Sequence, residues 1–111
     1  ALVLMNDIQF VEASKILAER MQKEGGNTLD EQIAYAFRLA VSRFPKEEEK
    51  TILKELFETQ SVRFDKNPKL ALDLLSVGQK EIDKSLNFKT TAALTMVANT
   101  ILNHDETYMK R

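Results

Sequence analysis

The sequence predicts an all-α fold, a small bundle of about five helices with a central, mostly apolar C-terminal helix. Apolar residues recur at spacings of three and four along most of the chain, and residues 92–102 would be apolar on nearly every side of a helix. Three glycines and two prolines in 111 residues are too few for the many tight turns of an all-β fold. A chain of this length fits one domain with a single core, here residues 1–111.

The first helix is expected to begin at Asn6 or Asp7, either of which can cap it, and to end at the glycines 25–26. Its apolar stripe consists of Phe10, Ala13, Leu17 and Met21. Three pairs of opposite charge stand four residues apart and are expected on the side that faces water: Lys15–Glu19, Glu19–Lys23 and Arg20–Glu24.

The second helical segment is expected over residues 27–44, and its start is marked by a capping box of Thr28 and Glu31. Its apolar stripe consists of Ile33, Phe37, Ala40 and Phe44, widened by Ala36 and Val41. Pro45 is expected to close this helix and to stand in the first turn of the next, because proline suits a first helical turn but not an interior.

The third helix is expected over residues 45–64, with three glutamates at 47–49 in its first turn, where the helix dipole favours negative charge. Its buried side is expected to consist of Ile52, Leu53, Leu56, Phe57 and Phe64. Asn67 as cap and Pro68 at the first position then start a short fourth helix that ends at Gly78. Residues 79–89 show no period and read as a loop, and the fifth helix is expected over residues 90–106.

Composition excludes several classes of function. The 16 Lys and Arg residues and 17 Asp and Glu residues alternate along the chain and give a formal charge of -1, so the basic excess of a nucleic-acid binder is absent. With no cysteine, the chain has no disulfide, thiolate zinc site, cysteine nucleophile or C-x-x-C-H haem attachment. No stretch reaches the length of a membrane span. The opening "ALVLM" reads as the start of a piece of a longer protein.

His104 is the obvious candidate for chemistry, since it is the only histidine and is followed by Asp105 and Glu106. A second helical metal ligand would stand three or four residues away, where this chain has Thr100, Ile101, Thr107 and Tyr108. The favoured interpretation is the polar end of a helix, where histidine suits the dipole. The glutamates at 47–49 diverge around a helix and are interpreted as a solvated first turn rather than a cation site.

Arg38 and Arg43 admit two interpretations. Their guanidinium groups could bind a carboxylate or sulfate ligand, or could form an interhelical ion pair or carbonyl clamp, with Glu48 as a partner. The structural interpretation is favoured. On the last helix, Thr95, Asn99 and Asn103 stand four residues apart, and such a line either marks a ligand face or bonds to neighbouring helices or to the backbone. No catalytic, cofactor-binding or metal-binding residue is assigned within this chain.

Three stretches taken together, "ALVLMND", "AFRLAVSRFP" and "MVANTILNHDE", resemble the C-terminal part of the domain of unknown function found in large planctomycete-type proteins. Those proteins typically carry a cytochrome-c-like domain and sometimes a lectin-like module. The positions that carry the resemblance are Leu4, Met5, Asn6, Asp7, Arg38, Arg43, Pro45, Glu48, Asn103 and Glu106. The chain departs from the family at Lys46, where a serine or threonine cap is common, and at Thr95, where a bulky residue is common.

The resemblance implies an extracytoplasmic location, periplasmic or at the cell surface, with haem elsewhere in the parent protein and residues 1–5 as the tail of an upstream helix. It implies a non-catalytic structural or interaction module at the C-terminus of that protein, with Arg38, Arg43, Glu48, Asn103 and Glu106 as polar anchors. Its partners would be the upstream domains, or a second copy through the apolar N-terminus. The alternative is part of a polysaccharide-related enzyme, to which Arg38, Arg43 and Glu106 would contribute and which would bind carbohydrate.

Overall fold

The computed structural model describes residues 8–78 and 80–104, and these residues form five helices and no strand. The helices are α1 (Ile8–Glu24), α2 (Leu29–Val41), α3 (Glu47–Lys66), α4 (Pro68–Leu75) and α5 (Phe88–Leu102). The predicted all-α bundle is therefore confirmed. The expected upstream-helix tail at residues 1–5 and the candidate Glu106 lie outside the described residues.

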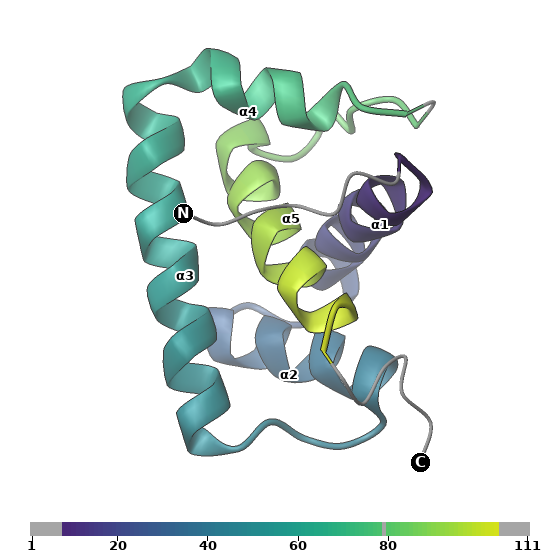
Figure 1. Cartoon of the computed structure of the whole chain (residues 1–111), viewed down its shortest axis with the longest axis vertical. Coiled ribbons are helices and arrows are strands. Elements are labelled where there is room, and N and C mark those ends of the chain that lie inside the picture. The colour runs from purple at the N-terminus through teal and green to yellow at the C-terminus, as the bar shows by residue number, and fades with distance from the viewer. Residues whose placement is uncertain (1–7, 79, 105–111) are drawn as a thin grey trace.

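α5 lies at the centre of the molecule, and the other four helices are arranged around it (Figure 1). Every residue from Thr91 to Asn99 is buried. The helix contributes to two apolar clusters: Leu94, Val97, Ala98 and Ile101 pack with α1, α2 and α3, while Ala92, Ala93 and Met96 pack with α3 and α4. The prediction of a central apolar helix is confirmed, and this helix connects the two parts of the core.

The first turns of α2 and α5 are each stabilised by a capping side chain. The Thr28 hydroxyl accepts from the Glu31 amide at 3.2 Å, and the Glu31 carboxylate accepts from the Thr28 amide at 3.2 Å, as predicted for α2. The Asn87 side chain accepts from the amides of Lys89 and Thr90 at 2.9 and 3.2 Å. α5 therefore begins at Phe88, two residues earlier than predicted, because Asn87 supplies a cap that the aperiodic surroundings conceal.

The connection between α2 and α3 differs from the prediction. α2 ends at Val41, where Ser42 adopts the left-handed conformation (φ 67°) and donates its amide to the Arg38 carbonyl at 3.0 Å. Pro45 lies in the connection rather than in a first helical turn, because α3 begins at Glu47 after an extended Lys46. The glutamates at 47–49 form the first turn of α3, as predicted.

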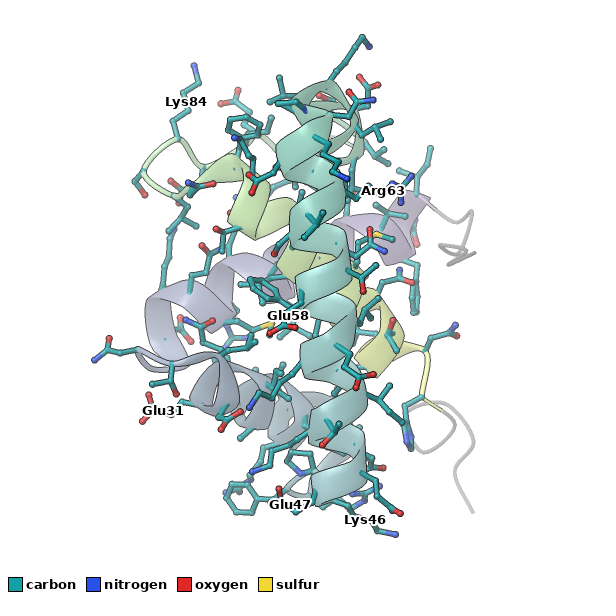
Figure 2. All side chains as sticks on the ribbon, turned by 90° about the vertical axis from the view of Figure 1, so that its left-hand side faces the viewer. Glu31, Lys46, Glu47, Glu58, Arg63 and Lys84 are labelled. Carbon is teal, nitrogen blue, oxygen red and sulfur yellow. The ribbon has the colours of Figure 1, made fainter. Side chains whose placement is uncertain are left out.

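α3 runs along one side of the molecule, and its outer face points toward the viewer in Figure 2. Leu53 and Phe64 are buried as predicted, whereas Ile52 is exposed. At the end of α3 the chain turns into α4, whose first residue is Pro68, as predicted. The Asn67 side chain makes no capping hydrogen bond, so that part of the prediction was wrong.

The buried face of α1 is also different from the prediction. Lys15 and Glu19, expected to face water, are buried, while Ala13 is exposed. The loop between α4 and α5 packs over this side of α1 and supplies polar partners to both charged residues. The ion pair of Arg20 with Glu24 is formed as predicted, at 3.2 Å on the exposed side.

None of the helices in the described part of the chain is both long enough and apolar enough to cross a membrane.

Candidate functional site

Arg43 and Glu49 form the most organised polar contact of the structure. The two guanidinium nitrogens Nη1 and Nη2 donate to the carboxylate oxygens Oε1 and Oε2, each at 2.9 Å. Nη1 also donates to the Phe44 carbonyl at 3.1 Å. Glu49 lies in the first turn of α3 and accepts from the Lys46 amide at 2.7 Å, so its carboxylate turns back toward the connection that holds Arg43. A bidentate pair of this kind fixes both charge and orientation.

Phe37 and His104 complete this corner, which we name the Arg43 corner: Phe37, Arg43, Glu49 and His104. The His104 Nε2 lies 3.5 Å from Glu49 Oε2. The Phe37 ring, only 1% exposed, has the Arg43 guanidinium 5.0 Å from its centroid and the His104 ring edge-on at 5.7 Å. The Arg43 corner therefore holds together α2, α3 and the end of α5.

The charges of the corner limit what it can do chemically. The hydrogen bonds from Arg43, with lesser contributions from the Lys46 amide and the His104 charge, lower the pKa of Glu49 from 4.5 to about 2. A carboxylate with so low a pKa is ionised at neutral pH and is a weak base, so it is poorly matched to proton transfer. The arrangement of the corner is that of a structural ion pair.

The other candidate residues lie apart from this pair. Glu48 is exposed, and the carboxylate that meets Arg43 belongs to its neighbour Glu49, because the third residue of α3 is the one that turns back toward the connection. Asn103 ends α5 and donates its amide to the Asn99 carbonyl at 3.0 Å. Arg38 is exposed on the outer side of α2, with its guanidinium 4.8 Å from the centroid of the Phe44 ring.

The polar residues Thr95 and Asn99 of α5 form hydrogen bonds inside the bundle. The Thr95 hydroxyl donates to the Thr91 carbonyl at 2.7 Å. The Asn99 amide donates to the Ser14 hydroxyl at 3.1 Å, and that hydroxyl donates to the Phe10 carbonyl at 3.0 Å. The contacts of Thr95 and Asn99 support internal hydrogen bonding: Thr95 bonds to the backbone of its own helix, and Asn99 bonds to Ser14 of the neighbouring α1.

Sequence reasoning missed Lys15, which is only 1% exposed. Its Nζ donates to the carbonyls of Val77 and Lys80 at 2.9 and 3.0 Å, and burial lowers its pKa. Glu12 accepts from the Lys80 amide at 2.8 Å, and Glu19 pairs with the Lys80 ammonium at 3.2 Å. These α1 side chains hold the loop after α4, and no local pattern in the sequence distinguishes them from an ordinary exposed charged face.

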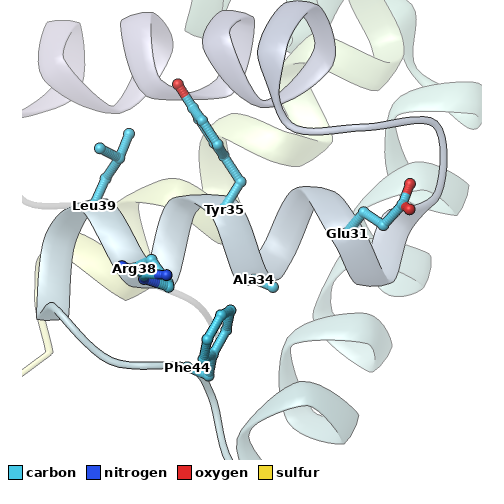
Figure 3. A pocket seen from close by; sticks show the side chains of 6 residues that line it. All are labelled: Glu31, Ala34, Tyr35, Arg38, Leu39 and Phe44. Carbon is cyan, nitrogen blue, oxygen red and sulfur yellow. The ribbon is translucent and has the colours of Figure 1, made fainter.

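Two shallow grooves lie side by side on the outer surface of α1 and α2. The first, about 470 Å³, is lined by Glu31, Ala34, Tyr35, Arg38, Leu39 and Phe44 (Figure 3). The second, about 340 Å³, is lined by Ala13, Ile16, Leu17, Arg20, Leu39, Ala40 and Leu102. Leu39 belongs to both, so the two grooves form one surface, which we name the α1–α2 surface. Its exposed apolar side chains include Leu39 at 49%, Phe44 at 64% and Ile16 at 42%.

In the described part of the chain, the side chains that could ligate a metal do not gather at one point. Among residues 8–78 and 80–104, no three His, Asp or Glu side chains are placed to hold a metal ion together.

These features define a class of protein: an all-helical domain whose ionic side chains hold its own helices together and whose α1–α2 surface is apolar. A family model described as PSD1, a protein of unknown function (DUF1553), matches residues 1–57, more than half of the 111-residue chain, and the chain belongs to this family. The match covers α1, α2 and the first half of α3. Comparison with curated proteins and with solved structures gives no match.

Proposed function

We propose that this chain is a non-catalytic helical interaction module and that the α1–α2 surface is where it contacts its partner. The observation that carries this proposal is the contrast between the two kinds of side chain. The ionic groups of the Arg43 corner and of Lys15 are engaged in internal contacts, whereas Ile16, Leu39 and Phe44 are left open to water. A contiguous apolar surface of this kind typically marks a protein contact.

The resemblance to planctomycete-type proteins supports a further part of the proposal. The module would form the C-terminal part of a larger extracytoplasmic protein that carries a cytochrome-c-like domain, and haem would be bound in that domain. The alternative is a polysaccharide-related active site to which Arg38, Arg43 and Glu106 would contribute, and it requires, among these, that Arg43 reach a ligand. Its guanidinium instead binds both oxygens of Glu49 and the Phe44 carbonyl, which favours the non-catalytic module.

Hydroxyl-radical footprinting tests the contact surface. The reactivity of Leu39 and Phe44 would be measured in this chain alone at low concentration, and in its complete polypeptide at high concentration, where a partner within the polypeptide or a second copy would be bound. The proposal expects both side chains to lose reactivity in the complete polypeptide. Val62 on α3, which is 53% exposed, is the matched apolar control and should change little. Equal reactivity of Leu39 and Phe44 in the two samples would overturn the proposal.

A second measurement tests the non-catalytic part. Melting curves of the chain would be recorded with divalent metals and with plain and sulfated oligosaccharides. A ligand present at a hundred times its dissociation constant stabilises the folded state by about 2.7 kcal/mol, which is readily detected. The proposal expects no shift of the melting temperature. A shift that Arg43→Ala or His104→Ala abolishes would instead support the enzyme alternative.

A further inference from the structure

The outer face of α2 carries charges in a self-complementary order. Glu31 and Arg38 are seven residues apart, which is two turns of a helix, so both lie on the same face of α2, separated by roughly 10 Å along its axis. Figure 3 shows this face, with Ala34 and Tyr35 between the two charged residues and Phe44 beside Arg38. A face with an acid at one end and a base at the other can pair with a reversed copy of itself.

The two charges are also available for such a pairing. Arg38 stacks on Phe44, and no carboxylate among residues 8–78 and 80–104 forms an ion pair with it. Glu31 accepts the amides of Asn27 and Thr28 through Oε1 alone, which leaves Oε2 without a hydrogen bond within the described residues. The second acid near this surface, Glu24, is already engaged by Arg20 and by the Tyr35 hydroxyl.

The surface around these charges has the composition of a protein interface. Leu39 and Phe44 are large and exposed, and Tyr35 lies between the charged residues. Aromatic residues and arginine are the side chains most enriched where proteins meet. Ala34 is small, so a second helix can approach closely at the middle of the face. On α3, by contrast, the exposed Ile52 and Val62 are ten residues apart, roughly 15 Å along the helix axis.

From this arrangement we infer that the partner of the α1–α2 surface is a second copy of this chain, with the two α2 helices packed antiparallel around a two-fold axis near Ala34 and Tyr35. Arg38 of each copy then meets Glu31 of the other, and Phe44 and Leu39 cover the apolar area beside them. Such an interface uses the same patch on both copies, so it closes as a dimer and does not extend into a fibre. This inference rests on the proposed function, since it names the partner of that surface.

Sedimentation velocity of the intact chain over a wide concentration range tests the inference. A reversible monomer–dimer equilibrium is expected, and it should weaken as salt is added, because exposed charge pairs are screened. Arg38→Glu should raise the dissociation constant at least about tenfold, because each Glu31 then faces a glutamate. Ile52→Asp on α3 is the matched control and should leave the equilibrium unchanged.

A charge-swap experiment tests the antiparallel geometry itself. Chains with Arg38→Glu have two acidic residues on the α2 face, and chains with Glu31→Arg have two basic ones, so each variant alone should be monomeric. Mixed together, the two variants should form a heterodimer, since both cross-contacts are then attractive. Because Glu31 also caps α2, circular dichroism must show that Glu31→Arg is folded. Glu31→Gln, which keeps a capping side chain, provides a second variant that should weaken the wild-type dimer.

Three results would overturn the inference: a chain that is monomeric at every concentration, a dimer that Arg38→Glu leaves intact, or a dimer that Ile52→Asp disrupts. The footprinting experiment tests the proposed function separately from the dimer. If Leu39 and Phe44 are protected in the complete polypeptide while the isolated chain stays monomeric, the surface is a contact surface for a different partner. If neither protection nor dimer is found, both proposals are wrong.

Discussion

Glu49 links the stability of the fold to pH. Its pKa is about 2 in the folded protein, where Arg43 binds its carboxylate, and near 4.5 when unfolded. Its stabilising contribution is therefore complete above about pH 4.5 and is lost as the pH falls toward 2. We expect Glu49→Gln to lower the free energy of unfolding by about 1–2 kcal/mol at neutral pH, since the pair is partly exposed to solvent.

Urea denaturation at several pH values checks this expectation. The difference between wild type and Glu49→Gln should shrink steadily as the pH is lowered below 4.5. Glu48→Gln is the matched control, since Glu48 lies in the same first turn of α3 but is exposed, and it should have little effect at any pH. A difference for Glu49→Gln that does not depend on pH would contradict the role of the ionised carboxylate.

Ser42 ends α2 in the left-handed backbone conformation, with φ 67°, which residues other than glycine rarely adopt. Glycine adopts this conformation without steric cost and is the residue most common just after a helix. We expect Ser42→Gly to raise the free energy of unfolding by about 0.5–1 kcal/mol, measured by urea denaturation. Thr59→Gly, in the exposed interior of α3, should instead lower it by a few tenths of a kcal/mol, because glycine is a poorer helix former than threonine. A loss of stability in Ser42→Gly would mean that the Ser42 side chain contributes more than its backbone strain costs.

Lys15 is a charged residue whose contribution comes from hydrogen bonds to the backbone. Its Nζ binds the carbonyls of Val77 and Lys80, and these acceptors would lose their donor in Lys15→Met. We expect a loss of about 2 kcal/mol in the free energy of unfolding, the usual value for hydrogen bonds to a charged group. Lys23→Met is the control on the same helix: its ion pair with Asp83 is at the surface, and its loss should cost clearly less than the loss of Lys15.

At the scale of the helices, the start of α5 depends on one side chain. Asn87 accepts two amides of the first turn, so Asn87→Ala should lower the free energy of unfolding by about 1 kcal/mol. Lys46 stands at the same position before α3, but the group that binds there is the Glu49 carboxylate, which accepts the Lys46 backbone amide. Lys46→Ala should therefore change stability by only a few tenths of a kcal/mol. Equal effects of the two substitutions in urea denaturation would contradict this assignment of caps.

The helices could be predicted well from the sequence because their signals are local. Spacing and the capping box of Thr28 with Glu31 identified α2, and the apolar circumference of α5 predicted its central place. The prediction of which side chains face water was wrong where a contact with residues far along the chain buries them. Lys15 and Glu19 form a regular pair of opposite charges four residues apart, yet the loop after α4 covers both of them.

At the scale of the whole molecule, the Arg43 corner likewise combines a contact that the local sequence indicates with contacts that depend on how distant parts of the chain pack. The sequence indicated an ion pair for Arg43, but the choice of Glu49 over Glu48 depends on how the chain turns between α2 and α3. The approach of His104 to Glu49 joins residues 55 positions apart, through the packing of α5 against α3. The extent of the α1–α2 surface depends likewise on how two helices lie together, and no single helix shows it.

The central place of α5 makes the first half of the chain dependent on the second. The family match ends at Phe57, and residues 1–57 include α1, α2 and part of α3. These helices bury Met21, Ile33 and Phe37 in a cluster whose remaining members include Leu94, Val97 and Ile101 of α5. Without α5 the apolar faces of α1 and α2 would be open to water, and short helices are marginal when they lack packing.

We therefore expect a fragment of residues 1–57 to be largely unfolded, with weak helical circular dichroism and no cooperative thermal transition. The full chain should unfold in a single transition, because α5 belongs to both apolar clusters and its loss exposes both. Ile33→Ala in the first cluster and Leu75→Ala in the second should each lower the midpoint of that one transition, since each opens a cavity in a buried cluster. A cooperative transition in the fragment, or two separate transitions in the full chain, would show that the family-matched half folds without α5.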